Sequence, residues 1–195
     1  MINEIFKNPT LINMNYNMIR SIKTKFTNKI TVGDYIIERI VREKIYCGFG
    51  HKSDNNINKL NEYAENHQKF SLILNYIEKY SGYSAFTYSL LNKKPGVLVS
   101  NSEDGFKNLL EPVYKNYVSN NPLLFISLYK DNNNKESLIE KFMIESYNMN
   151  TTHRFPHIFD YLLLKSYSKP THLKINEELL SEKIDLDLIQ YHRKK

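Results

Sequence analysis

Cysteine, tryptophan and glycine are scarce in this sequence, whose 195 residues hold one cysteine, no tryptophan and six glycines. The single cysteine, Cys47, excludes an internal disulfide and any cysteine-rich zinc or iron–sulfur site, which favours a reducing compartment. No apolar run approaches the roughly 18 residues that cross a bilayer, so we expect no membrane partner. So few glycines also leave few positions at which the backbone could approach a phosphate group closely.

Motifs typical of nucleotide binding and catalysis are absent too. Gly48 and Gly50 lack the third glycine of a dinucleotide-binding turn, and neither a Gly-Lys-Ser/Thr phosphate loop nor a Gly-x-Ser-x-Gly nucleophile turn occurs. The six histidines are scattered, and Pro156 separates the nearest pair, His153 and His157. We therefore predict no catalytic residue, no cofactor and no metal, and hence that the protein is not an enzyme.

Positive charge is concentrated at the two ends of the chain. The formal net charge is +6, of which residues 1–70 contribute +4, residues 71–190 contribute −1 and the last five residues +3. Basic ends attract polyanions, of which nucleic acid is the commonest, although a solvated pair of disordered tails has the same pattern. The distribution predicts a basic N-terminal extension (1–29), a central α/β domain (30–190) and a basic C-terminal tail (191–195).

Asparagine and lysine are abundant, with 24 asparagines and with 22 lysines against five arginines. These residues have AT-rich codons, whereas arginine, glycine, alanine and tryptophan largely do not. The bias therefore predicts a very AT-rich genome, that of an organelle, a reduced bacterium or a virus.

Short apolar runs alternate with helical spacing along the chain. Helices are expected over 31–46, where Gly48 and Gly50 would end the helix, over 77–91, 106–117, 138–147 and 173–184, and as a short turn around Leu60. Strands are expected over 70–74, 97–99, 122–129, 155–164 and, weakly, 184–189. This alternation predicts an α/β fold, a mostly parallel sheet flanked by helices in Rossmann-like or flavodoxin-like layers, without a long helical hairpin insertion.

Read in order, several segments resemble the universal small-subunit ribosomal protein two family. Residues 30–31 and 50–52 (Ile-Thr and Gly-His-Lys) are similar to the start and end of the family's opening helix. Residues 95–100 (Pro-Gly-Val-Leu-Val-Ser) are similar to its Gly-Lys-Ile-Leu-Phe-Val-Gly-Thr strand, and 172–177 to a later His-Ile-x-Ile-x-Glu helix opening. The resemblance spans about residues 30–190 but lacks the family's Arg-Trp-Leu-Gly-Gly segment.

The resemblance implies a shortened, mitochondrial ribosomal protein, a structural constituent of the small subunit in translation. Its implied partners are small-subunit rRNA and neighbouring ribosomal proteins, without homo-oligomers, and its location is the mitochondrial matrix or, alternatively, the cytoplasm of an AT-rich bacterium. Lysine and arginine would neutralise phosphates without reading bases, although Lys52 and Lys59 are equally typical of ordinary solvated surface. The expected rRNA contacts are Arg39, Arg42, Lys52, Lys59, Lys93, Lys94, Arg154, Arg193, Lys194 and Lys195.

Two other interpretations remain open from the sequence. Residues 82–122 loosely resemble the sensory half of a quorum-type transcription regulator, which suggests a viral or bacterial α/β ligand-sensing or regulatory domain, although no helix-turn-helix follows. A small α/β enzyme is the third interpretation, and it requires a polar pocket whose residues the sequence does not identify.

Overall fold

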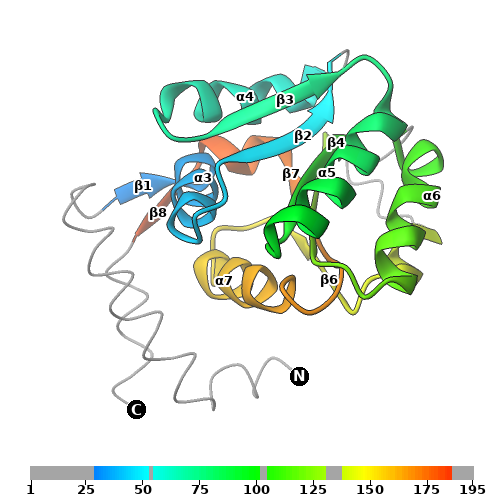
Figure 1. Cartoon of the computed structure of the whole chain (residues 1–195). Helices are drawn as coiled ribbons and strands as arrows, with labels where there is room; N and C mark the ends of the chain where they lie inside the picture. Colours follow the sequence, from blue (N-terminus) through cyan, green and yellow to red (C-terminus); the bar gives the residue numbers. More distant parts are fainter. Residues whose placement is uncertain (1–28, 53–54, 102–104, 131–137, 186–195) are drawn as a thin grey trace, which may run out of the picture.

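The computed structural model describes residues 29–52, 55–101, 105–130 and 138–185 (Figure 1). Six strands form one sheet in the order β3-β2-β4-β5-β7-β6, and every neighbouring pair is parallel. The predicted fold class, a mostly parallel sheet flanked by helices, is therefore confirmed.

In chain order the elements are β1 (Lys29–Thr31), α3 (Val32–Arg42), β2 (Cys47–His51), α4 (Asn55–Asn66), β3 (Ser71–Asn75), α5 (Glu78–Asn92), β4 (Gly96–Asn101), α6 (Gly105–Val118), β5 (Leu123–Tyr129), the 3-10 helix η1 (Leu138–Phe142), β6 (Glu145–Met149), α7 (Phe155–Lys165), β7 (Thr171–Asn176), the 3-10 helix η2 (Glu177–Ser181) and β8 (Lys183–Asp185).

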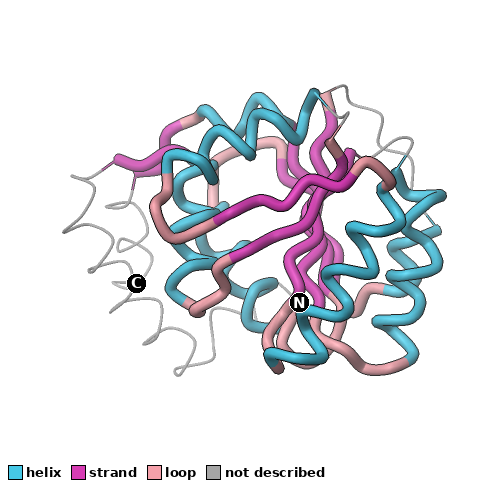
Figure 2. The backbone as a smooth tube through the Cα atoms, turned by 45° about the horizontal axis from the view of Figure 1, so that its top comes forward, coloured by secondary structure: helices cyan, strands magenta, loops and turns pink. Residues whose placement is uncertain are grey.

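Helices cover the sheet in two layers (Figure 2). Helices α5 and α6 lie on one face, which we call the α5 face, while α3, α4 and α7 lie on the other, which we call the α3 face. Strands β1 and β8 form a separate antiparallel pair beside α3, with Ile30 opposite Ile184. Because all six strands of the main sheet run the same way, their carboxyl ends meet at one edge, where ligands of open α/β sheets bind.

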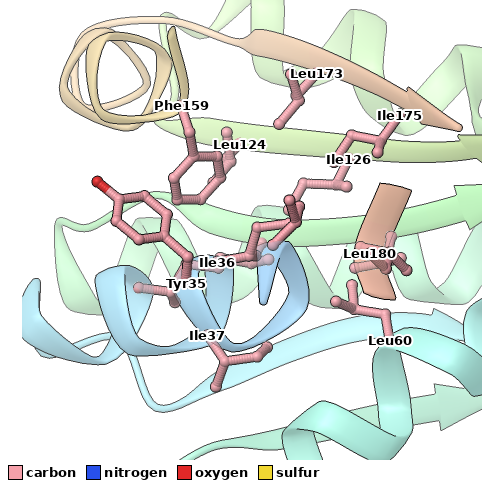
Figure 3. Packing of buried hydrophobic residues seen from close by; sticks show 14 of the residues in the cluster. Tyr35, Ile36, Ile37, Leu60, Leu124, Ile126, Phe159, Leu173, Ile175 and Leu180 are labelled. Carbon is pink, nitrogen blue, oxygen red and sulfur yellow. The ribbon is translucent and has the colours of Figure 1, made fainter. Parts of the chain in front are cut away.

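The α3 face carries the larger hydrophobic core (Figure 3). Leu124, Ile126 and Leu128 of β5 alternate toward this face and are fully buried. Helix α3 supplies Tyr35, whose ring makes edge contacts with two phenylalanine rings of α7 at centroid distances of 6.3 Å. Burying apolar surface of this kind contributes about 25 cal/mol per Å², so this core is the main source of the domain's stability.

The glycines that were expected to end the first helix lie inside a strand instead. Helix α3 ends at Arg42, and Gly48 and Gly50 are buried residues of β2. A Cβ on Gly48 would lie 3.2 Å from the side chain of Leu72 on β3. The glycines serve close packing between strands rather than a helix stop, so the prediction of a helix end there was wrong.

The C-terminal third of the chain was assigned to the wrong element types. The expected strand over 155–164 is helix α7, and the expected helix over 138–147 is the short η1 followed by strand β6. The expected helix over 173–184 is strand β7, then η2 and β8. Continuous apolar runs such as that of α7 fit a buried strand or a buried helix equally well by periodicity, and length is the better guide.

Candidate functional site

Polar side chains form a row across the carboxyl half of the sheet on the α5 face. The strands contribute Ser100 from β4, Ser127 from β5 and Lys174 from β7, and each is at most 5% exposed. Helix α5 adds Glu78, which is 7% exposed. Buried polar groups cost free energy unless they are hydrogen-bonded, so a row of them at the ligand-binding edge is the strongest candidate site in the described part of the chain.

Glu78 is the first residue of α5 and lies just beyond the end of β3. Ile77 at the N-cap makes no side-chain hydrogen bond to the helix. Glu78 lies in the first turn, where the positive end of the helix dipole stabilises a negative charge. The Ser100 hydroxyl donates a short hydrogen bond to the Glu78 carboxyl group. Among the described residues this serine is the only hydrogen-bond partner of the Glu78 side chain, and no cation there pairs with it.

A second set of hydrogen bonds fixes the start of α5 against the sheet. The Ser81 hydroxyl donates to the carbonyl oxygen of Gly50 over 2.6 Å, and the Asn75 amide donates to Ser81 Oγ over 3.1 Å. These bonds join α5 to β2 and β3, the two strands that precede it in the chain. The carboxyl group of Glu78 is therefore held in one place relative to the edge of the sheet.

His172 lies further along the same face and is fully buried. Its Nε2 is 2.7 Å from Ser127 Oγ and its Nδ1 is 3.0 Å from Ser146 Oγ, while its ring stacks on Phe125 at 4.8 Å. Burial, together with the nearby charge of Lys174, lowers the pKa of His172 to about 3. The imidazole is thus neutral at physiological pH and bonded through both nitrogens, which makes it a structural link between β5, β6 and β7.

A buried ion pair lies on the α3 face. The Arg39 guanidinium is 2.6 Å from Asp160 on α7, and the Tyr35 hydroxyl donates to the same carboxyl group over 3.0 Å. Burial raises the pKa of Asp160, and the attraction of Arg39 opposes that rise. The Arg39 guanidinium also lies 3.6 Å from the Glu43 carboxylate, and its Nη1 is buried without a hydrogen-bond partner. The cluster is enclosed between the two helices, so it joins α3 to α7 and does not form an open site.

The predicted rRNA contacts do not come together on one surface. Arg39 is 2% exposed and paired with Asp160, so its charge is not available to a polyanion, and the prediction for this residue was wrong. Arg42 pairs with Glu38 at 2.8 Å at the end of α3. Lys52 donates to the Tyr76 hydroxyl over 2.8 Å at the carboxyl edge, and Lys59 lies half-buried on α4.

The other predicted contacts are equally dispersed. Lys93 is the C-cap residue of α5, and Lys94 donates to the carbonyl oxygen of Lys44 over 2.8 Å. Both lysines lie at the amino ends of the strands, whereas Lys52 lies at their carboxyl ends. Arg154 precedes α7 in a left-handed conformation and is exposed. Arg193, Lys194 and Lys195 lie outside the described residues, as does most of the predicted extension over 1–29.

Among the described residues, no group of three or more histidine, cysteine, aspartate or glutamate side chains is arranged to hold a metal ion. No helix in the same residues combines the length and the apolar character needed to cross a bilayer.

The fold and the row of buried polar groups define an α/β domain with a carboxyl group at the ligand-binding edge of its sheet. Residues 30–154 match the family described as "thiamine pyrophosphate enzyme, N-terminal TPP binding domain", and the chain belongs to this family. The matched segment runs from β1 to beyond β6 and includes Glu78 and Ser100. No curated protein matches the sequence.

This family overturns the ribosomal resemblance. The predicted structural role in the small subunit, the rRNA and ribosomal-protein partners, and the expectation that the protein is not an enzyme were wrong. The alternative interpretation, an α/β ligand-sensing or regulatory domain, agrees better with a cofactor-binding family than the ribosomal role does. The short patterns at residues 95–100 and 172–177 misled because they are parts of buried parallel strands, which many α/β domains share. The AT-rich host, the mitochondrial or bacterial location and the proposed domain limits stay predictions.

Glu78 did not figure in the interpretation of the sequence, although a signal for it was present. It stands four residues after the predicted buried strand over 70–74 and is the second residue of the predicted helix over 77–91. In a parallel α/β sheet such a strand-to-helix junction lies at the carboxyl edge, where ligands bind.

Proposed function

We propose that this chain binds thiamine pyrophosphate as part of a thiamine-pyrophosphate-dependent enzyme, and that Glu78 holds the aminopyrimidine ring of the cofactor. The placement of the Glu78 carboxyl group carries the proposal. It lies inside the segment that matches the family, at the carboxyl edge of a parallel sheet, and it is more than nine-tenths buried with one hydroxyl partner among the described residues.

The chemistry of a carboxyl group suits the aminopyrimidine ring. Such a ring presents nitrogen acceptors beside an amino group that donates. A carboxylate accepts hydrogen bonds, and a protonated carboxyl group also donates one. Glu78 can therefore bond to this ring in either form, and the Ser100 hydroxyl and the Ser81 bonds hold it in position.

The described residues include few groups that could bind the diphosphate of the cofactor. Phosphate groups are usually held by glycine-rich loops at helix N-termini and by metal ions. Here Gly48 and Gly50 lie within strand β2, and no metal-binding cluster occurs among the described residues. We propose that the groups that bind the diphosphate lie outside the described part of this chain.

Thiamine pyrophosphate, when bound, supplies a carbon that stabilises carbanions formed during bond breakage. With the cofactor bound, Glu78 would orient its ring, and the burial of Glu78 and Ser100 would limit the access of water to that contact. Orientation of a reactive group in a fixed geometry is itself a large contribution to catalysis.

Isothermal titration calorimetry of the full chain tests this proposal. Titrants are thiamine pyrophosphate with Mg²⁺ and thiamine, which has the same ring without the diphosphate. We expect both to bind, because the proposed contact of Glu78 is made to the ring that the two titrants share. Glu78→Gln keeps the size of the side chain but removes the acid, so it should weaken binding at least about tenfold, equivalent to a lost charged hydrogen bond.

Glu111→Gln is the matched control, since Glu111 is an exposed carboxylate on α6 that pairs with Lys79. It should bind like the wild type. Circular dichroism establishes that both variants are folded. Equal affinity of Glu78→Gln and wild type for thiamine, or no heat from either titrant with folded wild type, would refute the proposal.

A further inference from the structure

Lys174 is the charged residue of the polar row that the proposed ring contact does not use. Its side chain is nearly as buried as that of Glu78, with 5% exposed. The preceding part of the same face is apolar, and Leu98, Leu123 and Phe125 are fully buried there. Because burial of an ammonium group costs free energy, packing alone does not account for a lysine at this position.

The strand register places Lys174 in one line with other polar residues. Lys174 of β7 pairs with Ser127 of β5 on one side and with Asn148 of β6 on the other. Ser127 pairs with Ser100 of β4, whose hydroxyl bonds to Glu78. Neighbouring strands lie about 4.8 Å apart, which puts the backbone of Lys174 about 10 Å from that of Ser100. The line therefore has a carboxyl group at one end and an ammonium group near the other.

Two side chains of the neighbouring strands lie beside the ammonium group. Lys174 Nζ is 5.5 Å from the centre of the Tyr129 ring, and the Tyr129 hydroxyl donates to Asn148 Oδ1 over 2.8 Å. Burial and then the charge of Lys174 lower the pKa of His172 to about 3, so the nearby imidazole stays neutral. Lys174 is thus the positive group here, and an ammonium group binds carboxylates and phosphates by charge-assisted hydrogen bonds.

These three residues lie where a ligand of this fold is expected. Tyr129, Asn148 and Lys174 are each within the last three residues of their strands, at the carboxyl edge of the sheet. We propose that they form a subsite that binds an anionic group, a carboxylate or a phosphate, of the substrate. That the bound molecule is the substrate rests on the proposed function, whereas anion binding by Lys174 does not.

The subsite determines which substrates the protein accepts. A molecule that bears an acidic group neutralises the buried ammonium charge when it binds, and a neutral molecule of the same shape does not. The protein therefore selects acids over their neutral analogues. The line of polar residues from Glu78 to Lys174 places this acidic group to one side of the cofactor ring, over the ends of β5, β7 and β6.

Titration of the full chain with small anions, followed by NMR chemical shifts, tests the subsite without cofactor. Acetate and inorganic phosphate are the probes, and sodium chloride at equal ionic strength controls for screening. We expect at least one probe to bind with a millimolar dissociation constant and to shift the backbone amides of Ser127, Asn148 and Lys174. The tighter probe identifies the acidic group as a carboxylate or a phosphate.

Two variants establish whether Lys174 holds the anion. Lys174→Met keeps a long side chain without the charge and should raise the dissociation constant at least about tenfold. Asn148→Asp keeps Lys174 but places a carboxylate beside it, and this competitor should weaken binding by a similar factor. Lys165→Met is the matched control, because Lys165 is an exposed lysine whose Nζ lies 5.6 Å from the centre of the Tyr161 ring. It should bind like the wild type.

Circular dichroism establishes which variants are folded, and Asn148→Asp decides the question if Lys174→Met does not fold. Unchanged affinity in a folded Lys174→Met or Asn148→Asp overturns the subsite, and so does a wild type that binds neither anion.

Repeating the titration with saturating thiamine pyrophosphate and Mg²⁺ distinguishes substrate from cofactor. Anion binding should persist, and its loss would assign the subsite to the diphosphate and overturn the assignment to the substrate. A chain that binds the anion through Lys174 but does not bind thiamine pyrophosphate supports the subsite while refuting the proposed function.

Discussion

The two faces of the six-stranded sheet are built from alternate residues of the same strands, yet they differ in composition. On β5 the residues that point to the α3 face are leucine and isoleucine, whereas Ser127 and Tyr129 point to the α5 face. The α3 face is mostly apolar (Figure 3). Its buried charged groups are the pair of Arg39 with Asp160 and the Glu38 carboxylate, which pairs with Arg42. The α5 face has the polar row at its carboxyl half and a smaller apolar core toward the other edge.

This difference separates stability from function within one sheet. A face that is mostly apolar gains the most from burial. A face on which polar groups occupy part of the buried area is stabilised less by burial, and ligand sites commonly have this property. We therefore expect substitutions on the α3 face to affect the free energy of unfolding most, and substitutions in the polar row to affect it less.

The largest expected effect comes from breaking the ion pair of the α3 face. Asp160→Ala leaves the buried Arg39 charge without its closest partner and should lower the free energy of unfolding by about 3–5 kcal/mol. Urea denaturation followed by circular dichroism measures this change. In Glu111→Ala the exposed pair with Lys79 is lost instead, and the expected cost is below about 1 kcal/mol.

A double variant distinguishes the loss of the ion pair from the loss of side-chain volume. Arg39→Met together with Asp160→Leu removes both charges and keeps apolar volume, so it should recover most of the stability that Asp160→Ala loses. If the double variant were no more stable than Asp160→Ala, the ion pair would not be the source of the loss.

Adjacent residues of β5 compare the two faces directly. Ile126→Ala opens a cavity in the core of the α3 face and should cost about 2–5 kcal/mol. Ser127→Ala removes one hydrogen bond to His172 and should cost about 1–2 kcal/mol. The same urea measurement checks both, and an equal or larger cost for Ser127→Ala would contradict the division of roles between the faces.

The sequence predicted the N-terminal two-thirds of the fold better than the rest. Helices α3, α5 and α6 have one apolar side at helical spacing, and β3, β4 and β5 are short apolar runs between turns, so periodicity identified them. Strand β2 was missed because Gly48 and Gly50 are read locally as helix breakers, whereas their role depends on Leu72 and Val97 of neighbouring strands. Periodicity contains no information about such contacts between distant segments.

The candidate site was harder to predict than the fold. Glu78 and Ser100 are 22 residues apart in the chain, and only the parallel pairing of β2 with β3 and β4 brings them together. Basic residues were chosen for their charge, but Arg39 shows that charge in a sequence does not establish exposure. A search for acidic residues directly after predicted parallel strands would have selected Glu78.

The pH dependence of stability tests the polar row itself. His172 has a pKa of about 3 in the folded protein because burial and Lys174 disfavour its charged form, whereas an unfolded histidine has a pKa of about 6.5. Below about pH 6.5 the unfolded chain therefore binds a proton that the folded chain does not. This lowers the free energy of unfolding by about 1.4 kcal/mol for each pH unit as the pH falls further.

His172→Gln isolates this contribution, because glutamine does not titrate and can still bond to both serines. Comparison of urea denaturation at pH 6 and pH 4 should show a shallower loss of stability in the variant than in the wild type, by about 1.4 kcal/mol per pH unit. Identical slopes for the two proteins would mean that the histidine takes up a proton in the folded state. The imidazole would then be reached by solvent, and the α5 face would be more open at its polar row than its packing on Phe125 indicates.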